Sequence, residues 1–168
     1  IAIGSYSGAI LGKMMNGLPG LFAGMAVGVV ISVIVAFLVG LPTLRLKGDY
    51  LAIATLGVAE IIRVAVTNMK ITNGAAGISG VPLTNTWTIT YIALVLTTIL
   101  ILNYTFSSAG RATYAVLQDE IAAESMGVQV TKYKILAFVL GAATASIGGT
   151  LSATTLGAVT PSDFTFMK

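Results

Sequence analysis

Long apolar blocks alternate with short polar breaks along most of this chain. A helix needs about 20 mainly apolar residues to cross the hydrocarbon core of a bilayer. The pattern predicts four membrane-spanning helices, at residues 21–41, 50–66, 89–106 and 133–156. Pro42 is expected to end the first of them, and an apolar run at residues 1–12 predicts the end of a further helix. We therefore expect an all-α, polytopic membrane protein with at least four full or partial spans.

One polar segment interrupts this pattern, at residues 110–134, which carry six of the fifteen charged side chains. Good helix formers without Gly or Pro predict a single helix over residues 111–126, and Gly127 is a natural stop for it. Glu120 and Glu124 lie one turn apart on that helix and repel each other, so we expect a basic partner nearby. An apolar stripe on the same helix is formed by Tyr114, Leu117 and Ile121. Two interpretations remain open: a spacer on the membrane surface, or a docking element.

The composition indicates whether the apolar helices lie in water or in lipid. The 168 residues are 56% hydrophobic and only 9% charged, with a mean hydropathy of +0.95. Soluble domains carry about 25% charged residues, so this chain lacks the polar surface that water requires. The sequence contains no Cys and no His, which excludes disulfides, thiolate or imidazole metal ligands and imidazole general bases. We expect a non-enzymatic protein in a lipid bilayer, with no metal or cofactor bound by this chain.

The basic residues predict the orientation of the helices. The net charge is +3, but the basic side chains are scattered among loops and form no stripe with interleaved aromatics, so nucleic-acid binding is not expected. Cytoplasmic loops carry an excess of Lys and Arg, and alternating the loops makes cytoplasmic the side that receives Arg45, Lys47, Arg111, Lys132 and Lys134. The other side receives Lys13, Lys70 and Lys168. The polar segment is therefore predicted to be a cytoplasmic loop at residues 107–132.

The two ends of the chain lack the signals of a complete membrane protein. The sequence opens on Ile1 without a positively charged region or a small-residue cleavage site, so a signal peptide is not expected. It stops at Lys168, just after a turn signal. We expect residues 1–168 to form a single transmembrane domain that is incomplete at both ends.

Small residues recur at four-residue steps in several apolar blocks. Such spacing places them on one helix face and lets a neighbouring backbone come close. The candidates for this kind of packing are Gly4, Gly8, Gly20, Gly24, Gly28 and Gly149. Hydroxyl groups in the last span, including Ser146 and Thr150, can hydrogen-bond to their own helix or across to another. This last helix is therefore expected inside a bundle.

Two ionisable residues, Glu60 and Arg63, lie within a predicted span. Their i, i+3 spacing puts them on one face, and intramembrane charges mark functional sites by default. Two interpretations are open: a structural ion pair, or a part of a solute pathway. The linker at residues 67–88 is too rich in glycine for a long helix, and three interpretations are open: a lining of the pathway, an exposed loop, or a docking surface for an extracytoplasmic protein. Its pathway candidates are Asn73, Gly74 and Gly77.

The sequence EIAAESMG at residues 120–127 resembles the EAA-type cytoplasmic loop in permease subunits of ABC importers. A wider region, about residues 41–166, includes PTLRLKGDYLAIATLGVAEIIR and NGAAGISGVP and resembles the branched-chain amino-acid permeases, the LivM-like type in particular. The pattern departs from the general EAA consensus in two ways. Its acidic residue lies one position further from the glycine, and the Leu-Pro that commonly follows is missing.

This resemblance implies an ABC-importer permease bundle in a bacterial inner membrane, forming half of a translocation pore for branched-chain amino acids. It implies a second permease subunit, two cytoplasmic ATPase subunits that bind ATP and Mg²⁺, and an extracytoplasmic solute-binding protein. The coupling candidates that it suggests are Glu120, Ala122, Ala123, Glu124 and Gly127. Two alternatives remain: an ion-coupled secondary transporter or channel that uses Glu60 and Arg63, or an ABC permease for urea, other amides or sugars.

Overall fold

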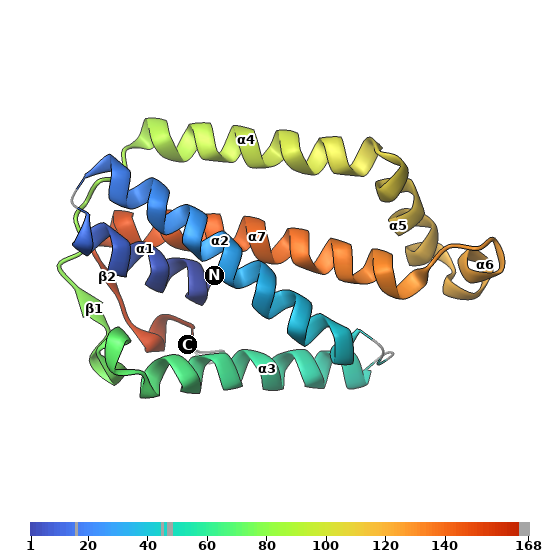
Figure 1. Ribbon diagram of the computed structural model, residues 1–168, viewed down its shortest axis with the longest axis horizontal. Helices are drawn as coiled ribbons and strands as arrows, with labels where there is room; N and C mark the ends of the chain where they lie inside the picture. The colour runs from blue at the N-terminus through green and yellow to red at the C-terminus, as the bar shows by residue number, and fades with distance from the viewer. Residues whose placement is uncertain (16, 45, 47–48, 165–168) are drawn as a thin grey trace.

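The computed structural model describes residues 1–15, 17–44, 46 and 49–164, and it is mainly helical (Figure 1). Its helices are α1 (Ala2–Met14), α2 (Leu18–Thr43), α3 (Asp49–Asn68), α4 (Trp87–Phe106), α5 (Ser108–Gln118), α6 (Glu120–Ser125) and α7 (Val130–Leu156). Within the described residues, four helices are long and apolar enough to cross a membrane: α2, α3, α4 and α7. The prediction of an all-α polytopic fold is therefore confirmed.

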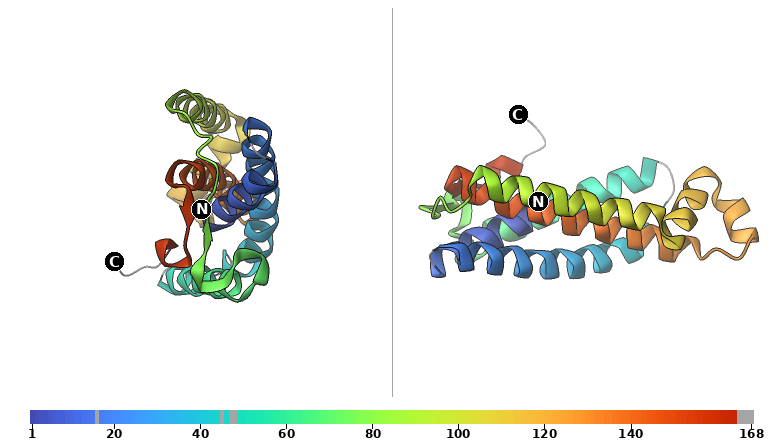
Figure 2. Two further views of the ribbon diagram at one scale, coloured as in Figure 1. Left: turned by 90° about the vertical axis from the view of Figure 1, so that its left-hand side faces the viewer. Right: turned by 90° about the horizontal axis from the view of Figure 1, so that it is seen from above.

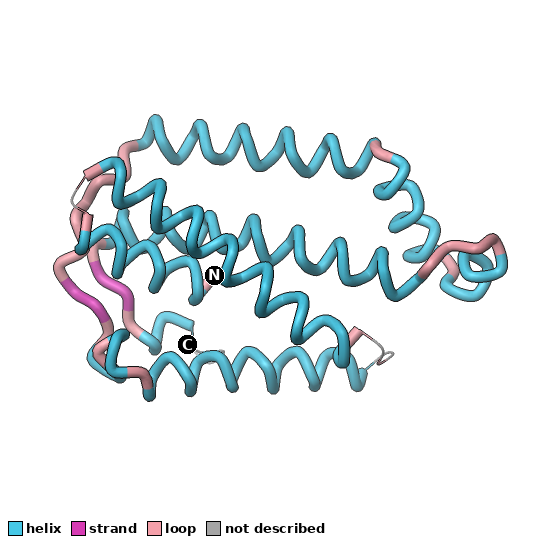
Figure 3. Tube along the Cα trace, viewed as in Figure 1, coloured by secondary structure: helices cyan, strands magenta, loops and turns pink. Residues whose placement is uncertain are grey.

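Helices α1, α2 and α7 form a central group, and α3 and α4 flank it on opposite sides (Figures 1 and 2). Helices α5 and α6 project at one end of the molecule, the polar end. The connections around the two-residue strands β1 (Ile78–Ser79) and β2 (Ala158–Val159) lie at the other end, the strand end (Figure 3). The spans therefore alternate in direction, as the loop assignment requires.

The described basic residues follow the predicted distribution between the two ends. Arg111 lies on α5, and Lys132 and Lys134 lie in the first turns of α7, all at the polar end. Lys13 lies at the strand end, where its Nζ donates to the carbonyl oxygen of Ser79 at 3.4 Å. The predictions for Arg45, Lys47 and Lys168 lie outside the described residues, as does that for the side chain of Lys70.

The spans extend slightly beyond their predicted limits, and Pro42 does not end α2 as expected. It lies in the last turn, and α2 continues to Thr43. Proline lacks an N–H donor, but the surrounding turn keeps other bonds. The N–H of Leu44 donates to Gly40 O at 3.0 Å, and the hydroxyl of Thr43 donates to Val39 O at 2.7 Å. Because Pro42 lies so close to the end of α2, its missing N–H removes little of the hydrogen bonding that holds the helix.

The glycine-rich linker is more ordered than its sequence suggests. It forms two 3₁₀ turns, η1 (Lys70–Thr72) and η2 (Gly74–Ala76), and then strand β1, which pairs antiparallel with β2 beyond α7. A third 3₁₀ turn, η3 (Pro161–Phe164), follows β2. The strand pair covers a small apolar core at the strand end, made of Tyr6, Ala9, Ile78, Val81, Ala153 and Val159. The linker is thus folded onto the central group.

Glycines bring the backbones of the central helices into close contact. A methyl group on Gly4 would overlap the backbone of Ser146, and one on Gly149 would overlap the carbonyl oxygen of Ile1. A Cβ on Gly24 would lie only 2.8 Å from the Cα of Gly8. The other glycines singled out for packing have these neighbours: Thr150 for Gly8, the Met15 carbonyl for Gly20, and the hydroxyls of Ser7 and Ser146 for Gly28.

Hydroxyl groups also join each pair of central helices. Each of four hydroxyls lies within hydrogen-bond distance of two carbonyl oxygens, one three or four residues earlier in the chain and one in a neighbouring helix, and its single hydrogen can be donated to either. The contacts between helices run from Ser5 to Gly149 (3.0 Å), Thr150 to Gly4 (2.9 Å), Ser7 to Gly24 (3.1 Å) and Ser32 to Ala142 (3.3 Å). Interhelical bonds of this kind contribute about 0.6–2 kcal/mol each in membranes. Their number makes the central group the most firmly connected part of the fold.

We predict that Gly4→Ala destabilises this central group, because the added methyl group can be accommodated only by moving α1 away from α7. Overpacking costs about 1–3 kcal/mol, and the better helix propensity of Ala offsets about 1 kcal/mol of that. The unfolding midpoint of the full-length protein in detergent should therefore fall. Gly57→Ala in α3 is the matched control, because no neighbouring atom of the described chain lies within 4 Å of its added Cβ. Equal midpoints for the two variants would contradict the packing.

Candidate functional site

The polar segment forms two short helices, α5 and α6, so the prediction of one helix over residues 111–126 is wrong. Asp119 separates them with an extended backbone (φ −154°, ψ 112°). Its Oδ1 accepts hydrogen bonds from the N–H groups of Ile121 and Ala122 at 2.9 and 3.1 Å, and so caps the start of α6. Asp competes with helix continuation through such local bonds. Helix propensity summed over the segment does not reveal this break.

Helix α6 ends at the predicted glycine. Gly127 has a φ of +82°, a conformation that side chains with a Cβ disfavour. Its N–H donates to Glu124 O at 2.9 Å, and the N–H of Val128 donates to Ala123 O at 3.0 Å. These two bonds form a Schellman motif, which turns the chain sharply from α6 towards α7.

The coupling candidates on α6 face in different directions. Ala123 is buried, with 5% of its surface exposed. Glu120 forms an ion pair with Lys134 in α7, which supplies the basic partner expected for it. Ala122 and Glu124 are exposed, and the part of the chain that the structure describes gives Glu124 no ion pair. Helix α6 is therefore attached to α7 on one side and open on the other.

The exposed surface of α5 and α6 is unexpectedly apolar for a segment beyond the spans. The side chains of Leu117, Ile121 and Met126 are 77%, 75% and 84% exposed. The break at Asp119 separates Ile121 from the rest of the predicted stripe, and sequence reasoning missed Met126. The sequence feature that could have revealed Met126 is its position, as a large apolar residue directly before the glycine that ends a polar helix. Exposed apolar side chains of this kind suit a contact with another protein or with the membrane surface, so the spacer and the docking interpretation both stay open.

Glu60 and Arg63 form an ion pair on α3, at the predicted spacing. Arg63 Nε donates to Glu60 Oε2 at 2.9 Å, and Arg63 Nη2 bonds Glu60 Oε1. Two parallel bonds of this kind fix the guanidinium firmly. Counted from Asp49 at 1.5 Å per residue, Arg63 lies about 21 Å along α3. The pair is therefore in the half of the span nearer the strand end.

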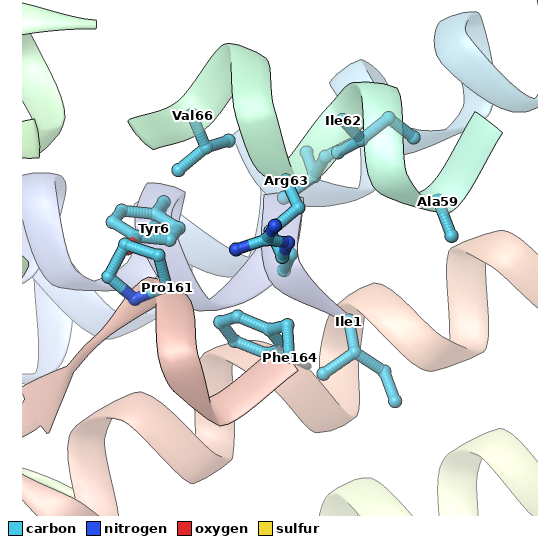
Figure 4. Close-up of a pocket in the computed structure, with 10 residues that line it drawn as sticks. Ile1, Tyr6, Ala59, Ile62, Arg63, Val66, Pro161 and Phe164 are labelled. Carbon is cyan, nitrogen blue, oxygen red and sulfur yellow. The ribbon is translucent and has the colours of Figure 1, made fainter. Parts of the chain in front are cut away.

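Arg63 also lines a cavity of about 210 Å³ between α1, α3 and η3 (Figure 4). The guanidinium projects from α3 into this space, towards Phe164 and Ile1. The rings of Tyr6 and Phe164 contact each other on one side, with centroids 6.4 Å apart. The other side chains of the lining are apolar: Ala2, Ile3, Ala59, Ile62, Val66 and Pro161. The cavity is thus an apolar space with one cationic wall.

The linker candidates lie elsewhere, at the strand end. The side-chain amide of Asn73 donates to Gly77 O at 3.1 Å, and Gly74 approaches the carbonyl oxygen of Thr67. Asn73 and Gly77 line a separate open pocket beside Lys13. The structure therefore brings Glu60 and Arg63 together but does not join them with Asn73, Gly74 and Gly77 in one cavity.

Comparison with known proteins identifies the family. The family model described as the permease component of branched-chain amino acid transport systems matches residues 1–167. The chain belongs to this family. The membership confirms the resemblance seen in the sequence, and the four apolar helices point to a multi-pass membrane protein.

Two curated relatives of this chain are the high-affinity branched-chain amino acid transport system permease proteins LivM of Salmonella typhimurium and of Escherichia coli K12. Each is 34% identical to the chain over 202 residues, which cover 99% of the chain and 47% of the relative. The chain thus spans about half the length of these relatives. No solved structure matches the chain.

We predict that Asp119→Ala loosens the start of α6. Losing an N-cap costs about 1 kcal/mol, which is roughly a fivefold change in an opening equilibrium. Hydrogen exchange of the Ile121 and Ala122 amides, measured by mass spectrometry on the full-length protein, should accelerate by about that factor. Asp119→Ser is the matched control, since its hydroxyl can still cap the helix and exchange should stay near wild type. Equal exchange in the alanine variant and the wild type would show that the cap contributes nothing.

Proposed function

We propose that this chain is part of the membrane-spanning permease subunit of an ATP-driven importer of branched-chain amino acids in a bacterial inner membrane. The match of the family model to residues 1–167 carries the proposal. The similarity to LivM, whose name describes a high-affinity permease for these solutes, supports it. In this function the subunit contributes half of the pore, and the chain catalyses no reaction.

The other steps of import are carried out by partner subunits. A second permease subunit completes the pore, and two cytoplasmic ATPase subunits bind ATP and Mg²⁺, which this chain does not bind. An extracytoplasmic solute-binding protein delivers the amino acid. The exposed apolar faces of α3 and α4 suit contacts with lipid, with the second permease subunit or with further helices of the same subunit.

Helix α6 is the element proposed to couple the permease to an ATPase subunit. It exposes the apolar side chain of Ile121 and the carboxylate of Glu124, which lines a groove beside the first turns of α7, and the exposed side chain of Met126 follows its last residue. The helix is fixed to α7 through buried Ala123 and the ion pair from Glu120 to Lys134. A short helix that is capped at both ends and attached in this way transmits a push without bending.

Helix α7 then carries the displacement into the membrane. It packs along both α1 and α2, with glycine contacts and interhelical hydroxyl bonds near its middle. Helices α3 and α4 pack less extensively against this central group. A push on α6 is therefore expected to move α1, α2 and α7 as one body relative to the flanking helices.

We predict that Glu124→Lys and Gly127→Val weaken ATPase docking while leaving membrane insertion intact. The first variant reverses an exposed charge of α6. The second strains a left-handed turn by about 1–2 kcal/mol and shifts α6 relative to α7. The amount of ATPase subunit that co-purifies with tagged full-length permease should fall, with a loss of about tenfold in apparent affinity.

Lys13→Glu is the control for these docking variants, because it reverses a charge of the same size at the opposite end of the molecule. It should leave the amount of co-purified ATPase unchanged. Unaltered docking and uptake in both α6 variants would remove the basis for assigning coupling to this helix.

A further inference from the structure

The guanidinium of Arg63 has hydrogen-bonding capacity that Glu60 does not use. Arginine carries five N–H donors in a planar fork, and Glu60 occupies Nε and one hydrogen of Nη2. No residue in the described ranges accepts a hydrogen bond from Nη1. The remaining edge, formed by Nη1 and the second hydrogen of Nη2, has the geometry that pairs with a carboxylate through two parallel bonds. The guanidinium itself lies in the cavity (Figure 4).

The rest of the cavity suits an aliphatic group. Ile62 and Val66 face it from α3, and the rings of Tyr6 and Phe164 bound it on the opposite side. Its volume of about 210 Å³ exceeds the roughly 150 Å³ of an apolar protein cavity that accommodates benzene. A branched aliphatic side chain can therefore be removed from water here.

Charge balance selects the kind of carboxylate that the cavity would accept. Glu60 and Arg63 are neutral as a pair, and an additional anion would bring net charge into a span, which is costly. A zwitterionic amino acid adds a carboxylate without net charge. Glu60, with 58% of its side chain exposed, stays accessible to an ammonium group. When the site is empty, Glu60 keeps the guanidinium paired, so the vacant cavity does not hold an isolated charge.

We propose that the cavity between α1, α3 and η3 transiently binds the transported solute, an amino acid with a branched aliphatic side chain. The cavity-facing edge of Arg63 binds its α-carboxylate, and Ile62, Val66, Tyr6 and Phe164 contact its side chain. This site rests on the proposed function of the chain and deepens it. It adds a selection step inside the permease for zwitterions over acids that lack the ammonium group. Its position near the strand end is the extracytoplasmic half of the span in the predicted orientation.

The site can be tested by photolabelling the complete importer. The full-length permease is reconstituted with its partner subunits in proteoliposomes, and a leucine analogue that carries a diazirine is activated during uptake. Mass spectrometry should locate the label in peptides that contain residues 59–66 or 161–164. Excess L-leucine should reduce this labelling at least tenfold. The same concentration of 4-methyl-2-oxopentanoate, which has the same side chain but no ammonium group, should reduce it less than twofold.

Variants of α3 test the role of each wall. Arg63→Gln removes the carboxylate partner, and Val66→Phe fills the cavity without altering the ion pair. Each should lower the labelling at least fivefold. Val64→Phe makes the same change at an exposed position of the same helix. This variant should be labelled to the same extent as the wild type. Because Val66→Phe retains both charges, it also tests the site if Arg63→Gln disturbs folding.

Two results would overturn the site while leaving the proposed function in place. The first is ATP-driven leucine uptake with the label located outside the two peptides. The second is equal labelling of Val66→Phe and Val64→Phe in an active importer. An assembled wild-type importer that takes up no branched-chain amino acid would instead overturn the proposed function and the site together.

Discussion

Close backbone contact between α1, α2 and α7 is the constraint on which the other features depend. Lipid tails are as apolar as aliphatic side chains, so the bilayer does not press helices together as water does, and packing and hydrogen bonds must hold them. Gly4 and Gly149 allow the backbones to meet, and the hydroxyls of Ser5 and Thr150 join them across the same contact. Small side chains and hydroxyl groups therefore hold these helices together, as large apolar side chains do in the core of a soluble protein.

This arrangement makes α7 the link between the two candidate sites. At the polar end it is attached to α6 through the ion pair of Lys134 with Glu120. At the strand end it leads through β2 into η3, whose Phe164 lines the cavity beside Arg63. A displacement of α7 that starts at the ATPase contact would therefore also move one wall of the proposed solute site. Coupling and solute binding would then share a mechanical element without sharing a residue.

Features encoded over one or two helical turns were predictable from the sequence, and contacts between distant segments were not. The apolar blocks predict the four spans, the spacing of Glu60 and Arg63 predicts their pair, and Gly127 predicts the end of α6. The pairing of Ile78 with Val159 escaped prediction, because neither two-residue strand has a pattern of its own. The break at Asp119 escaped because its cause is one capping side chain. The cavity at Arg63 was not predicted, because three elements that are distant in the sequence form it.

The most direct test of an ATP-coupled permease is uptake by the full-length protein, reconstituted in proteoliposomes with a second permease subunit, ATPase subunits and a solute-binding protein. Leucine uptake is measured with ATP on the ATPase side, then without ATP but with an imposed proton or sodium gradient. We expect accumulation only with ATP, and none when the ATPase subunits are omitted. Accumulation driven by an ion gradient alone, at an equal rate without the ATPase subunits, would contradict ATP coupling and indicate a secondary transporter.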